Sequence, residues 1–186
     1  MLKGWDSAAL AISMGVVAEH PVPALLPGGS CPLPVLLVED DENDVFFTQL
    51  AWNEASVFNP LWVCDDGDEA IKYLSGINEF ADRENYPLPC ALLTDLHTPN
   101  VDGFRLLEWM QVRPQFIDMP KFAFSANDDQ NARNRVLALG ATDYLIKPMS
   151  IPERTALVRN LARNWFPHAA PSHSAKASAI EHFSIK

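Results

Sequence analysis

Short apolar runs of this chain each end in a polar side chain that can take part in phosphoryl chemistry. In chain order these residues are Glu39 with Asp40, then Asp95, Ser125 and Lys147. Packed carboxylates repel one another unless a cation keeps them ionised, and a small cluster of oxygen ligands suits Mg²⁺. A carboxylate beside such an ion can attack a phosphoryl group and form an acyl phosphate. An amine and a hydroxyl can then bind the phosphoryl oxygens.

Each of these residues also has an ordinary structural explanation when it is taken alone. Glu39 and Asp40 could serve only the start of the following helix, since carboxylates favour helix N-termini. Asp95 could be a loop aspartate, and the Lys147-Pro148 pair alone predicts a turn. His97 has no second histidine at metal-ligand spacing, so its side chain is interpreted as a loop histidine. The chemical interpretation depends on the joint pattern, because four separate runs each supply a suitable group.

The apolar runs themselves have the length and composition of buried strands. They cover residues 35–38, 61–64, 90–94, 122–124 and 144–146. Helical periodicity fills the intervals between them and follows the last run. The first helix is expected to bury Val45, Phe46, Leu50 and Ala51 along one face. The last helix, after residue 150, is expected to turn Leu157, Leu161 and Trp165 inward.

Five strands alternating with five helices predict an α/β fold with a doubly wound, parallel five-stranded sheet, the (βα)5 pattern. In such sheets, ligands bind in the crevice beyond the carboxyl ends of the strands. The polar residues described above all follow the carboxyl ends of their strands. The fold therefore predicts that they converge at one edge of the sheet.

Composition sets the limits of this folded unit and narrows its partners. Residues 1–33 end in a Pro/Gly-rich linker and residues 167–186 form a low-complexity tail, so the globule is expected at 34–166. The formal net charge of −10 argues against nucleic acid and against an anionic membrane surface as partners. The three cysteines show no metal-binding spacing and fit a reducing, cytoplasmic setting.

Four segments together resemble the receiver domain of two-component response regulators, which has a flavodoxin-like fold. They are VLLVEDDENDVF, ALLTDLHTPNVDGF, FAFSAND and GATDYLIKP. The resemblance covers residues 34–166, the whole expected globule. The acidic first segment and the long insertion before the third strand are similar to single-domain regulators that work beside phytochrome-type sensor kinases.

The resemblance implies a role for each residue of the site. Asp95 is the expected phosphoacceptor. Asp40 is the expected direct Mg²⁺ ligand, Glu39 acts on the ion through water, and the backbone carbonyl of His97 is a further ligand. The His97 side chain, unusual at this place, is expected at the mouth of the site, where it affects the lifetime of the acyl phosphate. Lys147 is expected to pair with the phosphoryl group.

The resemblance also implies a conformational switch. Ser125 is the expected switch hydroxyl, and Tyr144 matches the aromatic position that turns inward when Ser125 moves to the phosphate. A cis peptide bond is expected before Pro148. The expected phosphoryl donor is a sensor histidine kinase or a phosphotransfer protein. Output is expected through protein contact, including a second copy of this chain.

Two other functions are compatible with parts of the pattern. Haloacid-dehalogenase-type phosphatases also use an aspartate nucleophile with Mg²⁺, but they need a second aspartate two residues later, where this chain has His97. A pseudo-receiver that binds partners without phosphorylation normally lacks the acceptor aspartate or the lysine, and both are present here. The sequence therefore favours a phosphoacceptor signalling domain over an enzyme with a separate substrate.

Overall fold

Five parallel strands form one sheet at the centre of the structure, a computed structural model that describes residues 33–166. The strands are β1 Val35–Val38, β2 Leu61–Cys64, β3 Ala91–Thr94, β4 Lys121–Ser125 and β5 Asp143–Ile146. Their order in the sheet is β2-β1-β3-β4-β5. The predicted fold class is confirmed. The expected N-terminal extension, apart from Leu33, and the expected C-terminal tail lie outside the described residues.

Each α-helix follows one of the strands along the chain. The helices are α1 Glu42–Glu54, α2 Gly67–Ser75, α3 Gly103–Gln111, α4 Gln130–Ala138 and α5 Ile151–Trp165, with short 3₁₀ helices η2 Asn78–Ala81 and η3 Pro114–Phe116. All five α-helices have an aspartate or serine N-cap whose side chain accepts a hydrogen bond from the first turn. None of the helices in this described part of the chain is long and apolar enough to cross a bilayer.

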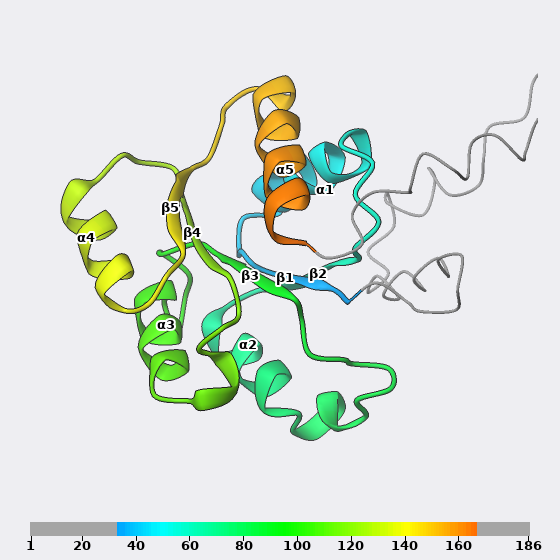
Figure 1. Cartoon of the computed structure of the whole chain (residues 1–186), viewed down its shortest axis with the longest axis vertical. Coiled ribbons are helices and arrows are strands. Elements are labelled where there is room, and N and C mark those ends of the chain that lie inside the picture. Colours follow the sequence, from blue (N-terminus) through cyan, green and yellow to red (C-terminus); the bar gives the residue numbers. More distant parts are fainter. Residues whose placement is uncertain (1–32, 167–186) are drawn as a thin grey trace, which may run out of the picture.

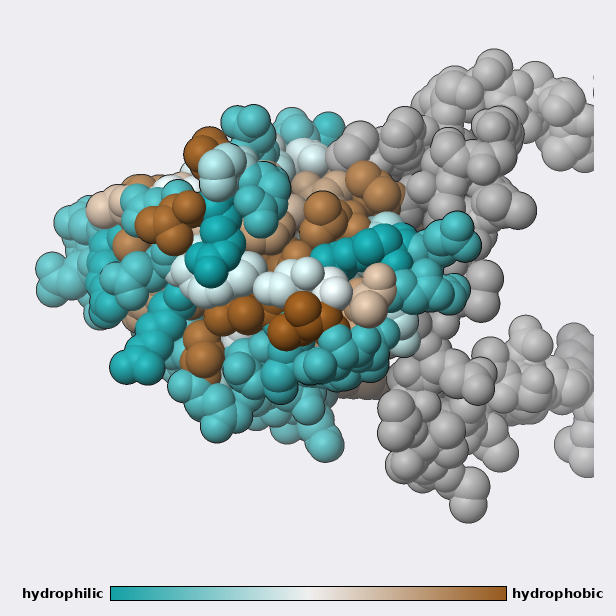
Figure 2. Space-filling model, turned by 90° about the horizontal axis from the view of Figure 1, so that it is seen from below, coloured by the Kyte–Doolittle hydropathy of each residue, from teal (hydrophilic) through white to brown (hydrophobic). Residues whose placement is uncertain are grey.

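The sheet separates two hydrophobic cores. Alternate side chains of a strand point to opposite faces, so Leu36 and Val38 join one core while Val35 and Leu37 join the other. Helices α1 and α5 cover one face, and α2 and α3 cover the opposite face (Figure 1). The face seen from the side of α2 and α3 is mostly hydrophilic, with hydrophobic residues gathered across its middle (Figure 2).

The contact between α1 and α5 is more polar than the sequence pattern predicted. Thr48, Ala51 and Trp52 are the buried residues of α1, and they face a side of α5 that buries Arg154 and Thr155. Two predicted inward residues, Phe46 and Trp165, are instead 47% and 44% exposed. The prediction was wrong for these two residues, while Ala51 and Leu161 are buried as expected. It followed apolar periodicity alone, whereas this interface also buries hydrogen-bonded polar groups.

Candidate functional site

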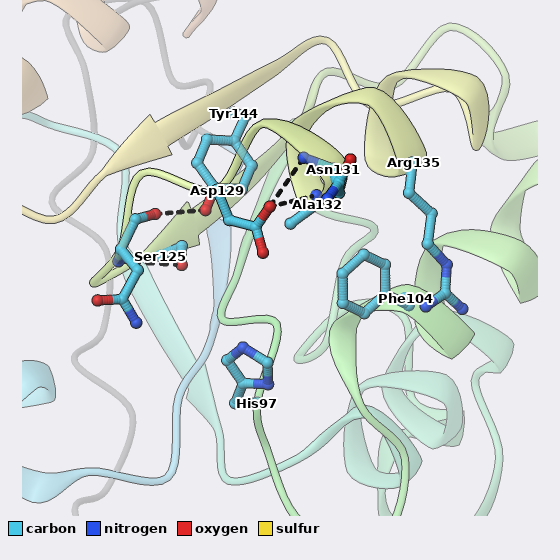
Figure 3. Close-up of a pocket in the computed structure, with 9 residues that line it drawn as sticks. His97, Phe104, Ser125, Asp129, Asn131, Ala132, Arg135 and Tyr144 are labelled. Atoms are coloured by element: carbon cyan, nitrogen blue, oxygen red, sulfur yellow. Dashed lines mark hydrogen bonds between the residues drawn. The ribbon is translucent and has the colours of Figure 1, made fainter.

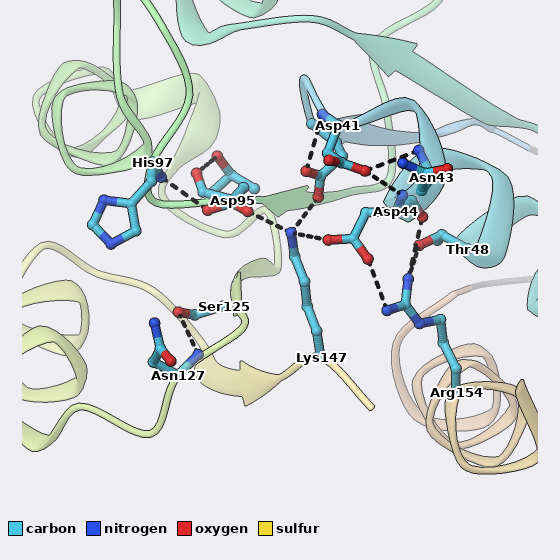
Figure 4. Close-up of polar contacts among 12 residues, drawn as sticks. Asp41, Asn43, Asp44, Thr48, Asp95, His97, Ser125, Asn127, Lys147 and Arg154 are labelled. Carbon is cyan, nitrogen blue, oxygen red and sulfur yellow. Dashed lines mark hydrogen bonds and ion pairs between the residues drawn. The ribbon is translucent and has the colours of Figure 1, made fainter. Parts of the chain in front are cut away.

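The carboxyl ends of four neighbouring strands bring the predicted polar residues to one edge of the sheet. Glu39 follows β1, Asp95 follows β3, Ser125 ends β4 and Lys147 follows β5. Figure 4 shows the side chains of Asp95 and Lys147 directed at each other, with Ser125 and His97 nearby. The parallel hydrogen-bond pattern of the sheet continues as far as these residues. The Lys147 N–H donates to the Ser125 carbonyl at 2.7 Å, and the Asp95 N–H donates to the Val38 carbonyl at 2.9 Å.

The ammonium group of Lys147 lies among three carboxylates. It donates to Glu39 Oε2 at 2.5 Å, to Asp44 Oδ2 at 3.0 Å and to Asp95 Oδ2. An ammonium has three N–H groups, so every donor of this buried side chain is used. The positive charge that holds these carboxylates together is therefore supplied, in this structure, by Lys147.

Burial and pairing act in opposite directions on the ionisation of this cluster. Burial by itself lowers the pKa of Lys147, but the hydrogen bonds and charges of Asp95 and Glu39 outweigh it and raise that pKa above its ordinary value. Burial raises the pKa of Glu39 from 4.5 to about 7, although Lys147 opposes the shift. Lys147 thus stays charged at neutral pH, while Glu39 titrates close to neutrality.

The raised pKa of Glu39 predicts a loss of stability as the pH rises, in the absence of divalent cations. Between pH 4.5 and about 7, the unfolded chain releases the Glu39 proton while the folded chain keeps it. The native state should therefore lose about 3 kcal/mol relative to a Glu39→Gln variant, which cannot ionise at this position. Urea unfolding of both proteins across this pH range measures the difference. Parallel pH curves for the two proteins would contradict the prediction.

Two residues of the cluster, Asp44 and Arg154, were missed by the sequence reasoning. Asp44 lies in the first turn of α1 and contacts both Lys147 and Arg154 Nη2, each at 3.0 Å. The sequence held a signal for Arg154, because it precedes Leu157 and Leu161 at helical spacing and therefore shares their inward face. Asp44 likewise follows Asp40 by one helical turn in the same acidic segment.

Asp95 is held by its own backbone surroundings. Its Oδ1 accepts a hydrogen bond from the His97 N–H at 2.8 Å, and its carbonyl accepts one from Thr94 Oγ1 at 2.9 Å. The first residue of α3, Gly103, passes so close that an added Cβ would lie 2.2 Å from the Asp95 carbonyl oxygen. The Asp95 side chain keeps 13% of its surface exposed, so a donor can reach it.

The donor set at this edge fits Mg²⁺. Carboxylates of Glu39, Asp40 and Asp95, with the His97 carbonyl, are all oxygen ligands, which hard divalent cations prefer. Asp40 is exposed beside the buried Glu39, where it is open to an ion. Within residues 33–166, no group of three acidic, histidine or cysteine side chains is already arranged around a metal position.

Ser125 and Tyr144 line one pocket beside the acidic cluster (Figure 3). Its volume is about 290 Å³, and its walls also include His97, Phe104 and Arg135. Tyr144 is buried, and its hydroxyl donates to the Asn127 carbonyl. The ring predicted to turn inward therefore already occupies an inward position in this structure, and its movement with Ser125 stays a prediction.

The peptide bond before Pro148, expected to be cis, is trans, and no peptide bond among the described residues is cis. The trans form of a bond to proline is favoured by about 0.5–1 kcal/mol. With the trans bond, the Pro148 carbonyl accepts hydrogen bonds from Arg154 Nε at 3.2 Å and from Arg154 Nη2 at 3.1 Å. This part of the prediction was wrong.

Residues 35–159 match the family model of the response regulator receiver domain, so the chain belongs to this family of two-component signalling domains. The response regulator Rre1 of Synechocystis sp. is 30% identical over 150 residues, which are 80% of this chain and 60% of Rre1. The chain spans about half the length of several of the curated bacterial relatives that it matches.

Solved structures confirm the predicted likeness to regulators of phytochrome signalling. The response regulator RPA3017, from red light signalling of R. palustris, is 28% identical with a TM-score of 0.69. The match covers 75% of this chain and 99% of RPA3017. The bacteriophytochrome response regulator RtBRR is 27% identical with a TM-score of 0.64, and the match covers 78% of this chain and 88% of RtBRR.

Proposed function

We propose that this chain is a phosphorylation-dependent switch whose phosphoacceptor is Asp95. A histidine kinase or a phosphotransfer protein donates the phosphoryl group. A carboxylate oxygen of Asp95 attacks the phosphorus, and the bond from phosphorus to the donor breaks as the acyl phosphate forms. The observation that carries the proposal is the position of the accessible Asp95 carboxylate, in contact with Lys147 and beside the acidic pair at the sheet edge.

Glu39 and Asp40, together with Asp95 and the His97 carbonyl, would hold Mg²⁺. When bound, the ion neutralises charge on the phosphoryl group as it is transferred. Lys147 would pair with the phosphoryl oxygens, since its ammonium already contacts the Asp95 carboxylate. Ser125 would donate a hydrogen bond to the same oxygens from the end of the adjacent strand.

Phosphorylation would change the surface of the domain through local electrostatics. The new group adds about −1.5 to −2 charge beside the pocket that Ser125 and Tyr144 line. A movement of Ser125 toward it would alter that pocket and the ring of Tyr144. The hydroxyl of this ring donates to the Asn127 carbonyl, and the Arg133 guanidinium lies over the ring, 4.8 Å from its centroid. The face formed by α4, β5 and α5 would then present a different surface to a downstream protein.

Intact mass measures the proposed reaction directly. After incubation with MgCl₂ and phosphoramidate, the wild type should gain one phosphoryl group, and Asp95→Asn should gain none. Asp41→Asn is the matched control, because Asp41 lies at the same edge but caps α1, and asparagine caps a helix equally well. It should be phosphorylated like the wild type. A folded wild type that gains no mass would contradict the proposal.

A further inference from the structure

Asp44 connects the lysine of the site to a buried arginine. One carboxylate oxygen, Oδ2, accepts from Lys147 at 3.0 Å, and the other, Oδ1, accepts from Arg154 Nη2 at 3.0 Å. Figure 4 shows Asp44 between the two cations. Its position along the side of Lys147 is thus fixed from α1 and from α5 together.

Arg154 has no free donor with which to adapt. It is 4% exposed, and the five N–H groups of a guanidinium are matched by five contacts. Nε and Nη2 reach the Pro148 carbonyl, Nη1 reaches the Asp44 carbonyl at 3.2 Å and Thr48 Oγ1 at 3.1 Å, and Nη2 also reaches Asp44 Oδ1. Arg154 therefore binds both the carboxylate that contacts the Lys147 ammonium and the carbonyl of Pro148, the residue after Lys147.

A lysine side chain has a long flexible stem, and an ammonium carries no directional preference of its own. Without a further partner, the position of the Lys147 ammonium would be set by Glu39 and Asp95 alone. The Asp44 carboxylate adds a contact on another side of the ammonium, and Arg154 prevents that carboxylate from following the lysine. This arrangement is suited to presenting an N–H group toward a phosphoryl group arriving at Asp95.

We propose that Asp44 and Arg154 are positioning residues that hold the Lys147 ammonium for phosphoryl transfer to Asp95. This inference rests on the function proposed above. Neither residue touches the reacting atoms, and both act through Lys147. Their effect should therefore appear in the maximal rate of transfer more than in the apparent affinity for the donor.

The test follows phosphorylation of the wild type and variants by phosphoramidate with MgCl₂, read by intact mass over time at several donor concentrations. Asp44→Asn and Arg154→Lys should each lower the maximal rate about tenfold. The double variant should be no slower than the slower single variant, because both residues act through the same lysine. Thr155→Val is the matched control: it removes another polar contact between α5 and α1, from Thr155 Oγ1 to Glu54, away from Lys147. It should keep the wild-type rate.

The sign of the Asp44→Asn effect separates positioning from charge. Removing a carboxylate makes the site less negative, which by itself favours an anionic donor. A lower rate in Asp44→Asn thus supports the proposal, and an unchanged or higher rate overturns it. An equal loss of rate in Thr155→Val, or an additive loss in the double variant, also overturns it. Asp44→Asn keeps the side-chain shape and decides the test even if Arg154→Lys fails to fold. If the wild type is not phosphorylated, both the proposed function and this inference are wrong. If the wild type is phosphorylated and Asp44→Asn reacts equally fast, only this inference is wrong.

Discussion

A Lys147→Met variant is expected to lose about 3 to 5 kcal/mol of folding free energy at neutral pH without divalent cations, the usual cost of leaving buried charges without their partner. The variant removes the one cation in contact with Glu39, Asp44 and Asp95 at once. Asp44 keeps Arg154, but Glu39 is buried and Asp95 nearly so. Urea unfolding with and without MgCl₂ is the measurement. Added Mg²⁺ should restore more stability to the variant than it gives the wild type.

A second buried lysine provides the control. Lys121 is 3% exposed, and its ammonium donates to the backbone carbonyls of Phe116, Ile117 and Met119 instead of to carboxylates. Lys121→Met should cost about 1 to 3 kcal/mol through the unsatisfied carbonyls, and this loss should not respond to Mg²⁺. If Mg²⁺ stabilised both variants equally, or Lys147→Met were as stable as the wild type without it, the electrostatic account of the cluster would be wrong.

A Gly103→Ala variant is expected to lose about 2 to 3 kcal/mol of stability, as overpacked sites do, together with most of its phosphorylation rate. The added Cβ would lie 2.2 Å from the Asp95 carbonyl oxygen and 3.0 Å from Thr94 Oγ1, so the end of β3 must shift. The shift acts on the backbone that carries the phosphoacceptor. Thermal unfolding and the phosphoramidate reaction together measure the two effects.

Gly140→Ala separates this steric effect from ordinary glycine strain. Gly140 has φ +85° after α4, and nothing lies within 4 Å of its added Cβ. Its replacement should cost about 1 to 2 kcal/mol through the left-handed backbone and should leave the phosphorylation rate unchanged. A Gly103→Ala protein with the wild-type rate would show that the contact with Asp95 tolerates the methyl group.

The strands and the strand-end residues were predictable because both are encoded locally. Buried strands of a parallel sheet are continuous apolar runs, and the predicted runs at residues 35–38 and 61–64 coincide with β1 and β2. Their order along the chain, combined with the carboxyl-end rule, was enough to predict that Glu39, Asp95 and Lys147 meet. The chemical roles of these residues stay predictions until the reaction is measured.

The contacts between α1 and α5 were less predictable because they depend on pairs far apart in sequence. Apolar periodicity cannot predict a buried face that includes the polar residues Thr48, Arg154 and Thr155. It therefore predicted that Phe46 faces inward. The partnership of Asp44 with Arg154 joins residues separated by 110 positions. Such a pair can be identified only when the packing of the two helices against each other is known.

The division of the interior by the sheet has a consequence for synthesis of the protein on the ribosome. The core beneath α2 and α3 is built from residues up to Tyr144, whereas the core on the other face needs Val158, Leu161 and Phe166 from the end of the domain. Trp52, which stacks on Phe166 with ring centroids 5.5 Å apart, has no cover from that ring until the last helix has been translated. Until α5 has been made, the chain lacks the side chains that cover this face of the sheet, so the second core cannot close before synthesis of the domain is nearly complete.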